Sequence, residues 1–263
     1  MIGGKSCMNN ILSLAGSTAL ITGASSGLGR HFAHTLAAAG ARVVVAARRT
    51  DKLAELIAEL ESSANVEAHA VELDVTQADS IKECFDSVGR LVGVADIIVN
   101  NAGITVTKPV LEQTEEDWDA TMATNLRGAF LVAQEAARRL VAAGKGGSII
   151  NTASITALRP AGAVTSYAVS KAGLVHLTKT MALELARYNI RVNAMAPGYL
   201  STDLNSDFLA SDAGEKMRKR VPQRRFGNLT ELDGPLLLLA SEAGSYMTGS
   251  VVVVDGGHML STL

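Results

Sequence analysis

The fold of this chain is decided by the stretch Ala19-Leu20-Ile21-Thr22-Gly23-Ala24-Ser25-Ser26-Gly27-Leu28-Gly29, which joins a short apolar run to a helical pattern beginning near Arg30. Glycines in such a turn permit a tight bend and a close approach of the backbone to a pyrophosphate, while the helix N-terminus adds oriented amide groups. The spacing is Gly-x-x-x-Gly-x-Gly, for which a purely structural turn is the alternative. Because the turn follows the first apolar strand, we predict that it binds the diphosphate of a dinucleotide. The predicted contacts are Gly23, Ser25, Ser26, Gly27, Leu28 and Gly29.

Apolar, β-branched runs recur along the chain and alternate with segments of helical spacing. Leu53, Leu56, Ile57 and Leu60, for example, follow the i, i+3, i+4, i+7 pattern of an amphipathic helix. Unbroken apolar runs are typical of strands that helices cover on both faces. We therefore predict an α/β fold, a single Rossmann-like, doubly wound parallel sheet of about seven strands with its ligand site at their carboxyl ends. The predicted strands span residues 19–22, 42–46, 68–73, 97–99, 148–152, 191–195 and 251–254.

The chain is predicted to form one domain. We find no repeats, low-complexity tracts or linkers, so we predict a single domain over residues 14–263, preceded by an extension over residues 1–13. Thr114, followed by three acidic residues, predicts the start of a long helix that runs to about Val141 and ends at Gly144. Residues 197–226 keep no sustained period, and long irregular segments of this kind are often binding loops, so we expect a substrate lid there.

Composition excludes several classes of function. Twenty-four Lys plus Arg nearly balance 26 Asp plus Glu among 263 residues, so no overall charge favours a nucleic acid or an anionic membrane. No apolar run approaches the roughly 18 to 20 residues that a membrane-spanning helix needs. The two cysteines, Cys7 and Cys84, are too few for a disulfide framework and lack metal-ligand spacing. We expect a cytoplasmic protein with reduced thiols and without a metal.

The end of the second predicted strand bears on the choice of cofactor. Enzymes that prefer NAD place an acidic residue on the ribose hydroxyl about twenty residues after the glycine turn. This chain has Arg48 and Arg49 there instead, and its first carboxylate is Asp51. The Arg48 guanidinium can pair with a 2′-phosphate in bidentate fashion, so we predict NADP(H), with NAD(H) still possible. The alternative is that both arginines are simply solvated.

Tyr167 and Lys171 are four residues apart in an apolar helical stretch and therefore share one face of the helix. A phenol, with an ordinary pKa of about 10, is a poor acid or base at neutral pH unless a nearby cation favours the phenolate. We expect Lys171 to supply that cation and to lower the pKa of Tyr167. Ser154 lies thirteen residues upstream, just after a predicted strand, where its hydroxyl could bind a carbonyl oxygen.

Five features follow one another along the chain: the glycine turn, Asn100-Asn101-Ala102-Gly103, Ser154, the Tyr167 to Lys171 pair and Pro197-Gly198. In their order and approximate spacing the chain is similar to the short-chain dehydrogenase/reductase family over residues 14–257. The resemblance implies that Tyr167 is the acid/base, that Lys171 is its pKa modulator and a ribose ligand, and that Ser154 orients the carbonyl. It also implies that Asn125 holds a water of a proton relay. Further cofactor contacts that it implies are Asp74, Val75, Asn101, Ala102, Gly103, Pro197, Gly198 and Thr202.

The resemblance implies an oxidoreductase that transfers a hydride between a nicotinamide and a ketone or secondary alcohol, and Arg48 favours reduction. An epimerase or dehydratase and a non-enzymatic NADP(H)-binding sensor are the alternatives. An acyl thioester is one possible substrate, because the predicted lid carries apolar residues beside basic ones, although charge runs are usually exposed faces and a solvated basic helix is the favoured explanation. The resemblance also implies a homotetramer or homodimer, built on the helices near 114–141 and 164–188 and on the tail strand. The lid residues concerned are Leu204, Phe208, Leu209, Lys216, Met217, Arg218, Lys219, Arg220, Arg224 and Arg225.

Overall fold

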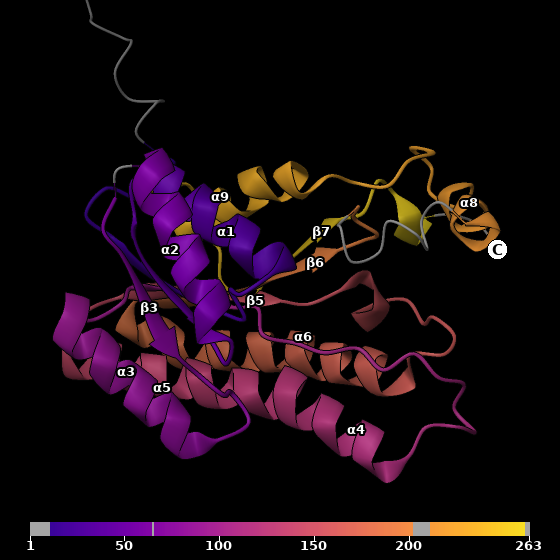
Figure 1. Ribbon diagram of the computed structural model, residues 1–263, viewed down its shortest axis with the longest axis horizontal. Helices are drawn as coiled ribbons and strands as arrows, with labels where there is room; N and C mark the ends of the chain where they lie inside the picture. The colour runs from indigo at the N-terminus through magenta and orange to yellow at the C-terminus, as the bar shows by residue number, and fades with distance from the viewer. Residues whose placement is uncertain (1–10, 65, 202–210, 261–263) are drawn as a thin grey trace, which may run out of the picture.

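The computed structural model describes residues 11–64, 66–201 and 211–260. A seven-stranded, wholly parallel sheet forms its centre, with the strand order β3-β2-β1-β4-β5-β6-β7 (Figure 1). The predicted fold class is confirmed, and each predicted strand lies within about three residues of an observed one. The strands are β1 (Thr18–Thr22), β2 (Arg42–Ala47), β3 (Ala68–Glu72), β4 (Ile97–Asn100), β5 (Gly147–Thr152), β6 (Ile190–Pro197) and β7 (Val251–Val254).

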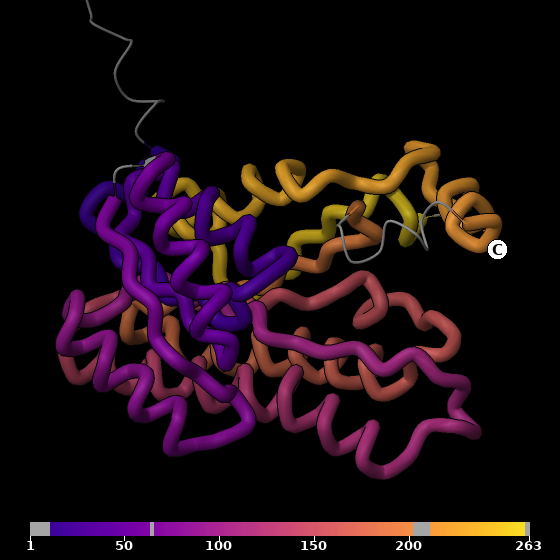
Figure 2. The backbone as a smooth tube through the Cα atoms, in the orientation of Figure 1, coloured from indigo at the N-terminus to yellow at the C-terminus, as the bar shows by residue number. Residues whose placement is uncertain are grey.

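Helices cover both faces of the sheet. One layer holds α1, α2 and α9, and the opposite layer holds α3, α4, α5 and α6, so the sheet lies between them (Figures 1 and 2). This burial explains why the strands read as unbroken apolar runs, since every residue of β1 is buried. The α-helices are α1 (Gly27–Ala38), α2 (Thr50–Ala64), α3 (Ala78–Val92), α4 (Glu115–Met122), α5 (Ala129–Ala142), α6 (Thr165–Leu185), α8 (Asp212–Arg218) and α9 (Asp233–Ala240).

The order of the strands creates the site. The chain moves outward from β1 to β2 and β3, then returns across the sheet to place β4 on the other side of β1. The loops that follow β1 and β4 therefore diverge to opposite faces, and a crevice opens between them at the carboxyl ends of the strands.

Two helices differ from the expectation. Helix α1 begins at Gly27, three residues before Arg30, so the last glycines of the turn belong to its first turn. The helix expected from Thr114 to about Val141 starts with the predicted cap, because Thr114 and Asp117 form a capping box. It is then divided by a π-helical segment, η2 (Ala123–Gly128), which separates α4 from α5.

The segment near 197–226 is only partly described. It contains α8 and a parallel bridge between Leu200 and Gly227. Residues Thr202, Leu204, Phe208 and Leu209 lie outside the described ranges, as does most of the expected extension over residues 1–13.

In the described ranges, no helix is both long and apolar enough to cross a membrane.

Candidate active site

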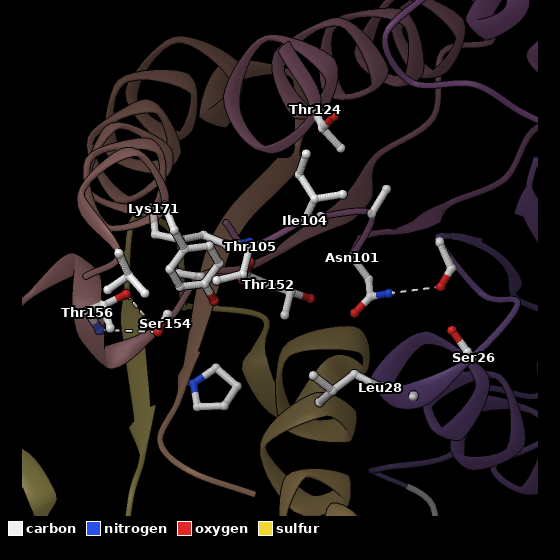
Figure 3. Close-up of a pocket in the computed structure, with 18 of the residues that line it drawn as sticks. Ser26, Leu28, Asn101, Ile104, Thr105, Thr124, Thr152, Ser154, Thr156 and Lys171 are labelled. Atoms are coloured by element: carbon white, nitrogen blue, oxygen red, sulfur yellow. Dashed lines mark hydrogen bonds between the residues drawn. The ribbon is translucent and has the colours of Figure 1, made fainter. Parts of the chain in front are cut away.

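A cleft of about 990 Å³ opens at the carboxyl ends of the strands. The segments that follow β1 to β6 line it, together with residues from the first two turns of α6. Figure 3 shows Ser26 and Leu28 on one side of this cleft and Ser154, Thr156 and Lys171 on the other. The glycine turn and the Tyr167 to Lys171 pair, which are about 140 positions apart in the sequence, thus face a single cavity.

The glycine turn is held tightly against the end of β4. Gly23 has a φ of +66°, and a Cβ at this position would lie 2.7 Å from the Cα of Ala102, so only glycine fits without a shift. The Thr22 hydroxyl accepts the N–H groups of Asn101 and Ala102 at 3.1 Å each. The Asn101 amide nitrogen donates back to the carbonyl oxygens of Thr22 and Gly23 at 3.1 and 3.2 Å. The Asn101 side chain therefore holds the glycine turn against the end of β4, and it also lines the cleft.

The two arginines after β2 do different things. The guanidinium of Arg49 donates to the hydroxyls of Ser25 and Ser26 at 2.9 and 2.8 Å, which carries positive charge onto the glycine turn. Arg48 is exposed and also lines the cleft. From the sequence we predict a phosphate contact for Arg48 and no separate role for Arg49. Nothing in the spacing separates two adjacent arginines, because the direction of each side chain depends on how the strand ends.

Asp74 and Val75 line the same end of the cleft. The Asp74 carboxylate accepts both the N–H and the hydroxyl of Thr76, at 2.9 and 2.8 Å. Partial burial opposes ionisation of Asp74, but these two hydrogen bonds and the nearby Arg48 outweigh it and lower the pKa of the carboxyl. A carboxylate and a guanidinium thus flank the space beside the glycine turn.

At the other end of the cleft, three side chains from two elements meet. Ser154 follows β5 and caps the short 3₁₀ helix η3 (Ile155–Ala157), while Tyr167 and Lys171 lie one turn apart on α6. Ser154, Tyr167 and Lys171 all line the cleft, and Lys171 Nζ is 5.7 Å from the centroid of the Tyr167 ring. The sequence predicted this group, and the fold brings it together at one cavity.

The electrostatics of Tyr167 run opposite to the expectation. Burial raises the pKa of the Tyr167 phenol, and the hydrogen bond with Ser154 offsets this only in part. Burial also lowers the pKa of Lys171 to about 8, and its ammonium donates to the carbonyl oxygen of Thr152 at 2.6 Å. Desolvation of both groups, which the sequence could not reveal, makes the Tyr167 phenol harder to ionise than an exposed one.

Asn125 lies in the π-helical segment and is wholly buried. Its amide oxygen accepts the N–H of Ile104 at 2.8 Å, and its amide nitrogen donates to the carbonyl of Ile104 and the hydroxyl of Ser170, at 2.9 and 3.1 Å. Both donors of the side chain are therefore used within the protein. Asn125 ties the loop after β4 to α6, and π-helical turns are frequent at functional sites.

Of the remaining predicted contacts, Ala102, Gly103, Pro197 and Gly198 line the same cleft. Gly29, in the first turn of α1, is not part of the lining, and Thr202 lies outside the described residues. The Thr152 hydroxyl, also in the lining, is buried and has no hydrogen-bond partner among the described residues. A glycine-lined cradle, an arginine pair and an unpaired hydroxyl are a donor and acceptor set that fits a phosphorylated dinucleotide.

Comparison with known proteins agrees with this geometry. Residues 23–259 match the family model described as enoyl-(acyl carrier protein) reductase. The 3-oxoacyl-[acyl-carrier-protein] reductase FabG of Thermotoga maritima is 40% identical over 248 residues, which cover 94% of this chain and 99% of that protein. Gluconate 5-dehydrogenase of Gluconobacter oxydans is 34% identical, with 96% of this chain and 98% of that protein covered.

A solved structure extends the likeness to three dimensions. The gluconate 5-dehydrogenase of Burkholderia cenocepacia, in complex with NADP and tartrate, superposes with a TM-score of 0.91 at 36% identity, covering 96% of this chain and 98% of that one. Fold, cleft and sequence agree over nearly the whole length of these proteins. The chain belongs to the short-chain dehydrogenase/reductase family of oxidoreductases.

Proposed function

We propose that this protein is an NADP(H)-dependent carbonyl reductase or alcohol dehydrogenase acting on a small-molecule ketone or secondary alcohol. The observation that carries the proposal is the convergence of Ser154, Tyr167 and Lys171 on one cleft whose far end holds the glycine turn and two arginines. Such a cleft can hold a dinucleotide and a substrate side by side, with an acid at the point where they meet.

The chain's own residues fit the cofactor. Gly23, Gly27 and Gly29 allow the turn to approach a diphosphate, and the N-terminus of α1 adds its amide groups. Arg48 and Arg49 offer charge-assisted hydrogen bonds to a 2′-phosphate, a reading supported by the NADP in the related Burkholderia structure. When bound, the reduced nicotinamide supplies the hydride. Asp74, Val75, Asn101, Lys171 and the Pro197-Gly198 pair would hold the rest of the dinucleotide.

In the proposed mechanism, the Ser154 hydroxyl donates a hydrogen bond to the carbonyl oxygen of the substrate and fixes its position. Tyr167 then gives its proton to the same oxygen as negative charge develops there. The phenol enters the reaction protonated, but burial raises its pKa and makes it a weak acid, so proton transfer needs a group that stabilises the phenolate. Lys171, which is buried beside the Tyr167 ring, stabilises the phenolate that results.

The substrate is proposed only by class. Met217 of α8 lines the cleft, which supports contact between this part of the expected lid and a substrate. The nearby basic residues are less available than the sequence suggested, because Arg218 pairs with Glu215 at 2.7 Å and Arg225 pairs with Glu231 at 2.6 Å. This pairing weakens the case for a cationic rim that receives an acyl thioester, and we propose a compact ketone as the first substrate to test.

The test is oxidation of NADPH and NADH by the purified protein across ketones, 3-oxoacyl thioesters and keto sugars, with Tyr167→Phe as the paired variant. Removing the phenolic proton while keeping the ring should reduce turnover at least about a hundredfold, since general acid catalysis contributes that much. NADPH should still bind. Turnover that survives in Tyr167→Phe would refute the assigned role. Products formed without net oxidation of NADPH would instead identify an epimerase or dehydratase.

Two further expectations belong to the same proposal. Resemblance to the family implies a homotetramer or homodimer, and exposed apolar side chains such as Trp118, Phe130 and Val169 on α4, α5 and α6 support an interface there. The small number of cysteines and the raised pKa of the buried Cys84 thiol, about 12, suit a cytoplasmic protein with reduced thiols.

A further inference from the structure

One hydroxyl in the cleft, that of Thr156, contacts the proposed carbonyl-binding serine directly. Thr156 follows Ser154 by two residues, is half-buried and lines the same cavity. Its backbone N–H donates to Ser154 Oγ at 3.1 Å, and its side-chain hydroxyl donates to the same oxygen at 3.0 Å. Figure 3 shows both hydrogen bonds as dashed lines between the two residues.

These two contacts occupy both acceptor lone pairs of the Ser154 oxygen. A serine hydroxyl has two acceptor lone pairs and one donor hydrogen, and its rotor turns to suit its partners. With both lone pairs occupied by Thr156, the remaining capacity of Ser154 is to donate. Tyr167 lines the same cavity as Ser154, so its phenol is one of the groups that this hydroxyl can face.

We infer that Thr156 is a positioning residue, which commits the single hydrogen of the Ser154 hydroxyl to the substrate oxygen in the cleft. The inference rests on the proposed function of Ser154 and Tyr167. Without the Thr156 hydroxyl, Ser154 keeps one free lone pair and can turn to accept a proton from Tyr167. That arrangement would hold back the proton that the substrate needs.

The experiment compares Thr156→Val, which keeps the shape and the N–H but removes the hydroxyl, with Thr156→Ser, which keeps the hydroxyl. For Thr156→Val we expect kcat to fall about tenfold, the size of one hydrogen bond in the transition state, while the Kd for NADPH stays within about twofold. The limb of the pH profile that belongs to Tyr167 should move to higher pH, by up to about one unit. Thr156→Ser should restore both, and Thr180→Val, an exposed site on α6, is the matched control.

A double-mutant cycle decides whether Thr156 acts through Ser154. In a Ser154→Ala background, Thr156→Val should have no further effect on kcat, because the partner it positions is gone. A full additional loss in that background would mean that Thr156 contacts the substrate itself, and would overturn the inference. Wild-type kcat and an unmoved pH profile in Thr156→Val would also overturn it. If instead the wild type shows no Tyr167-dependent turnover, the proposed function fails first, so the two failures are distinct.

Discussion

Two adjacent arginines at the end of β2 differ in what they touch, and this difference can be tested at the level of single residues. Both side chains are exposed and line the cleft, but Arg49 donates to the hydroxyls of the glycine turn, whereas Arg48 lies near Asp74. Arg48→Asp should repel a 2′-phosphate and accept a ribose hydroxyl. We expect the ratio of kcat/KM for NADPH to that for NADH to fall at least about tenfold, the loss of one charge-assisted hydrogen bond.

The control for this prediction is Arg90→Asp, the same change at an exposed position on α3. It should leave the ratio unchanged. An unchanged ratio in Arg48→Asp itself would remove Arg48 from the cofactor site and leave Arg49 as the candidate.

Lys171 makes the stability of the protein depend on pH in a definite direction. Burial lowers its pKa to about 8, against about 10.4 for an unfolded lysine. Between these values the unfolded chain binds more protons than the folded one, so this residue makes the free energy of unfolding rise with pH from about 8 to 10.4. Below pH 8 the buried ammonium destabilises the fold by an amount of order 3 kcal/mol, before its hydrogen bond to Thr152 is counted.

Lys171→Met should therefore raise the Tm of the ligand-free protein at pH 7 while abolishing turnover, since an apolar side chain of similar volume replaces a buried charge. The gain should shrink as the pH approaches 10. Thermal unfolding of both proteins between pH 6.5 and 10, with exposed Lys82→Met as the control, measures this. A lower Tm for Lys171→Met at every pH would show that its hydrogen bond outweighs its desolvation.

The residues of the site illustrate what a sequence can reveal. Tyr167, Lys171 and Ser154 were predictable because a four-residue spacing and a position after a strand are local patterns. The direction of the Tyr167 pKa was not, because it depends on how completely α6 packs against the sheet. The role of Arg49 was equally hidden, since it depends on the path of the chain beyond β2.

At the scale of the elements, the first turn of α1 leaves no room for a side chain at Gly29. A Cβ at Gly29 would overlap the carbonyl oxygen of Gly23 and lie 2.5 Å from the amide nitrogen of Asn101, so an alanine would displace the Asn101 side chain that holds the turn. We expect Gly29→Ala to lower both the Tm and the affinity for NADPH, the latter at least about tenfold, which is roughly the loss of one hydrogen bond to a charged group.

The matched control is Gly89→Ala in α3, where a Cβ would meet nothing within 4 Å. There the better helix propensity of alanine should stabilise the protein by up to about 1 kcal/mol and leave NADPH binding unchanged. Thermal unfolding and NADPH titration of both variants provide the comparison. Wild-type affinity in Gly29→Ala would mean that the turn can open without harm.

The elements themselves were predicted unequally. Strands and helix caps follow from short-range patterns, and the Thr114 cap formed as expected. The π-helical interruption could not be predicted from the sequence, because nothing in residues 123–128, Ala-Thr-Asn-Leu-Arg-Gly, is specific to a π-helical turn. Its cause is tertiary: Asn125 binds both backbone groups of Ile104, and Gly128 packs where a Cβ would lie 2.8 Å from the Val75 carbonyl. Contacts between distant segments, and not local propensity, set this break.

At the scale of the whole molecule, the parallel order of the sheet determines where function can lie. Apolar strands that alternate with helices imply right-handed crossovers, and these place the carboxyl ends of all the strands, and with them most of the predicted cofactor contacts, on one edge of the sheet. The sequence could predict the edge but not the volume of the cleft or the partners of each hydroxyl, because those depend on packing between layers.

We predict that the protein assembles into a dimer or a tetramer. The layer formed by α4, α5 and α6 exposes large apolar side chains, among them Leu183 at 83%, and β7 at the sheet edge exposes Val253 at 39%. Exposed apolar surface of this kind favours association through both regions. Sedimentation velocity should give two or four times the chain mass of 27.4 kDa.

Charged substitutions separate the two interfaces of a tetramer. Phe130→Glu should disrupt the helical interface and Val253→Glu the strand interface, so each single variant should sediment as a dimer and the double variant as a monomer, because an unpaired buried carboxylate is strongly unfavourable. Leu91→Glu, an exposed apolar position on α3, is the control and should not change the mass. A wild type that sediments at 27.4 kDa at micromolar concentration would contradict assembly altogether, and the cleft would then have to act within a single chain.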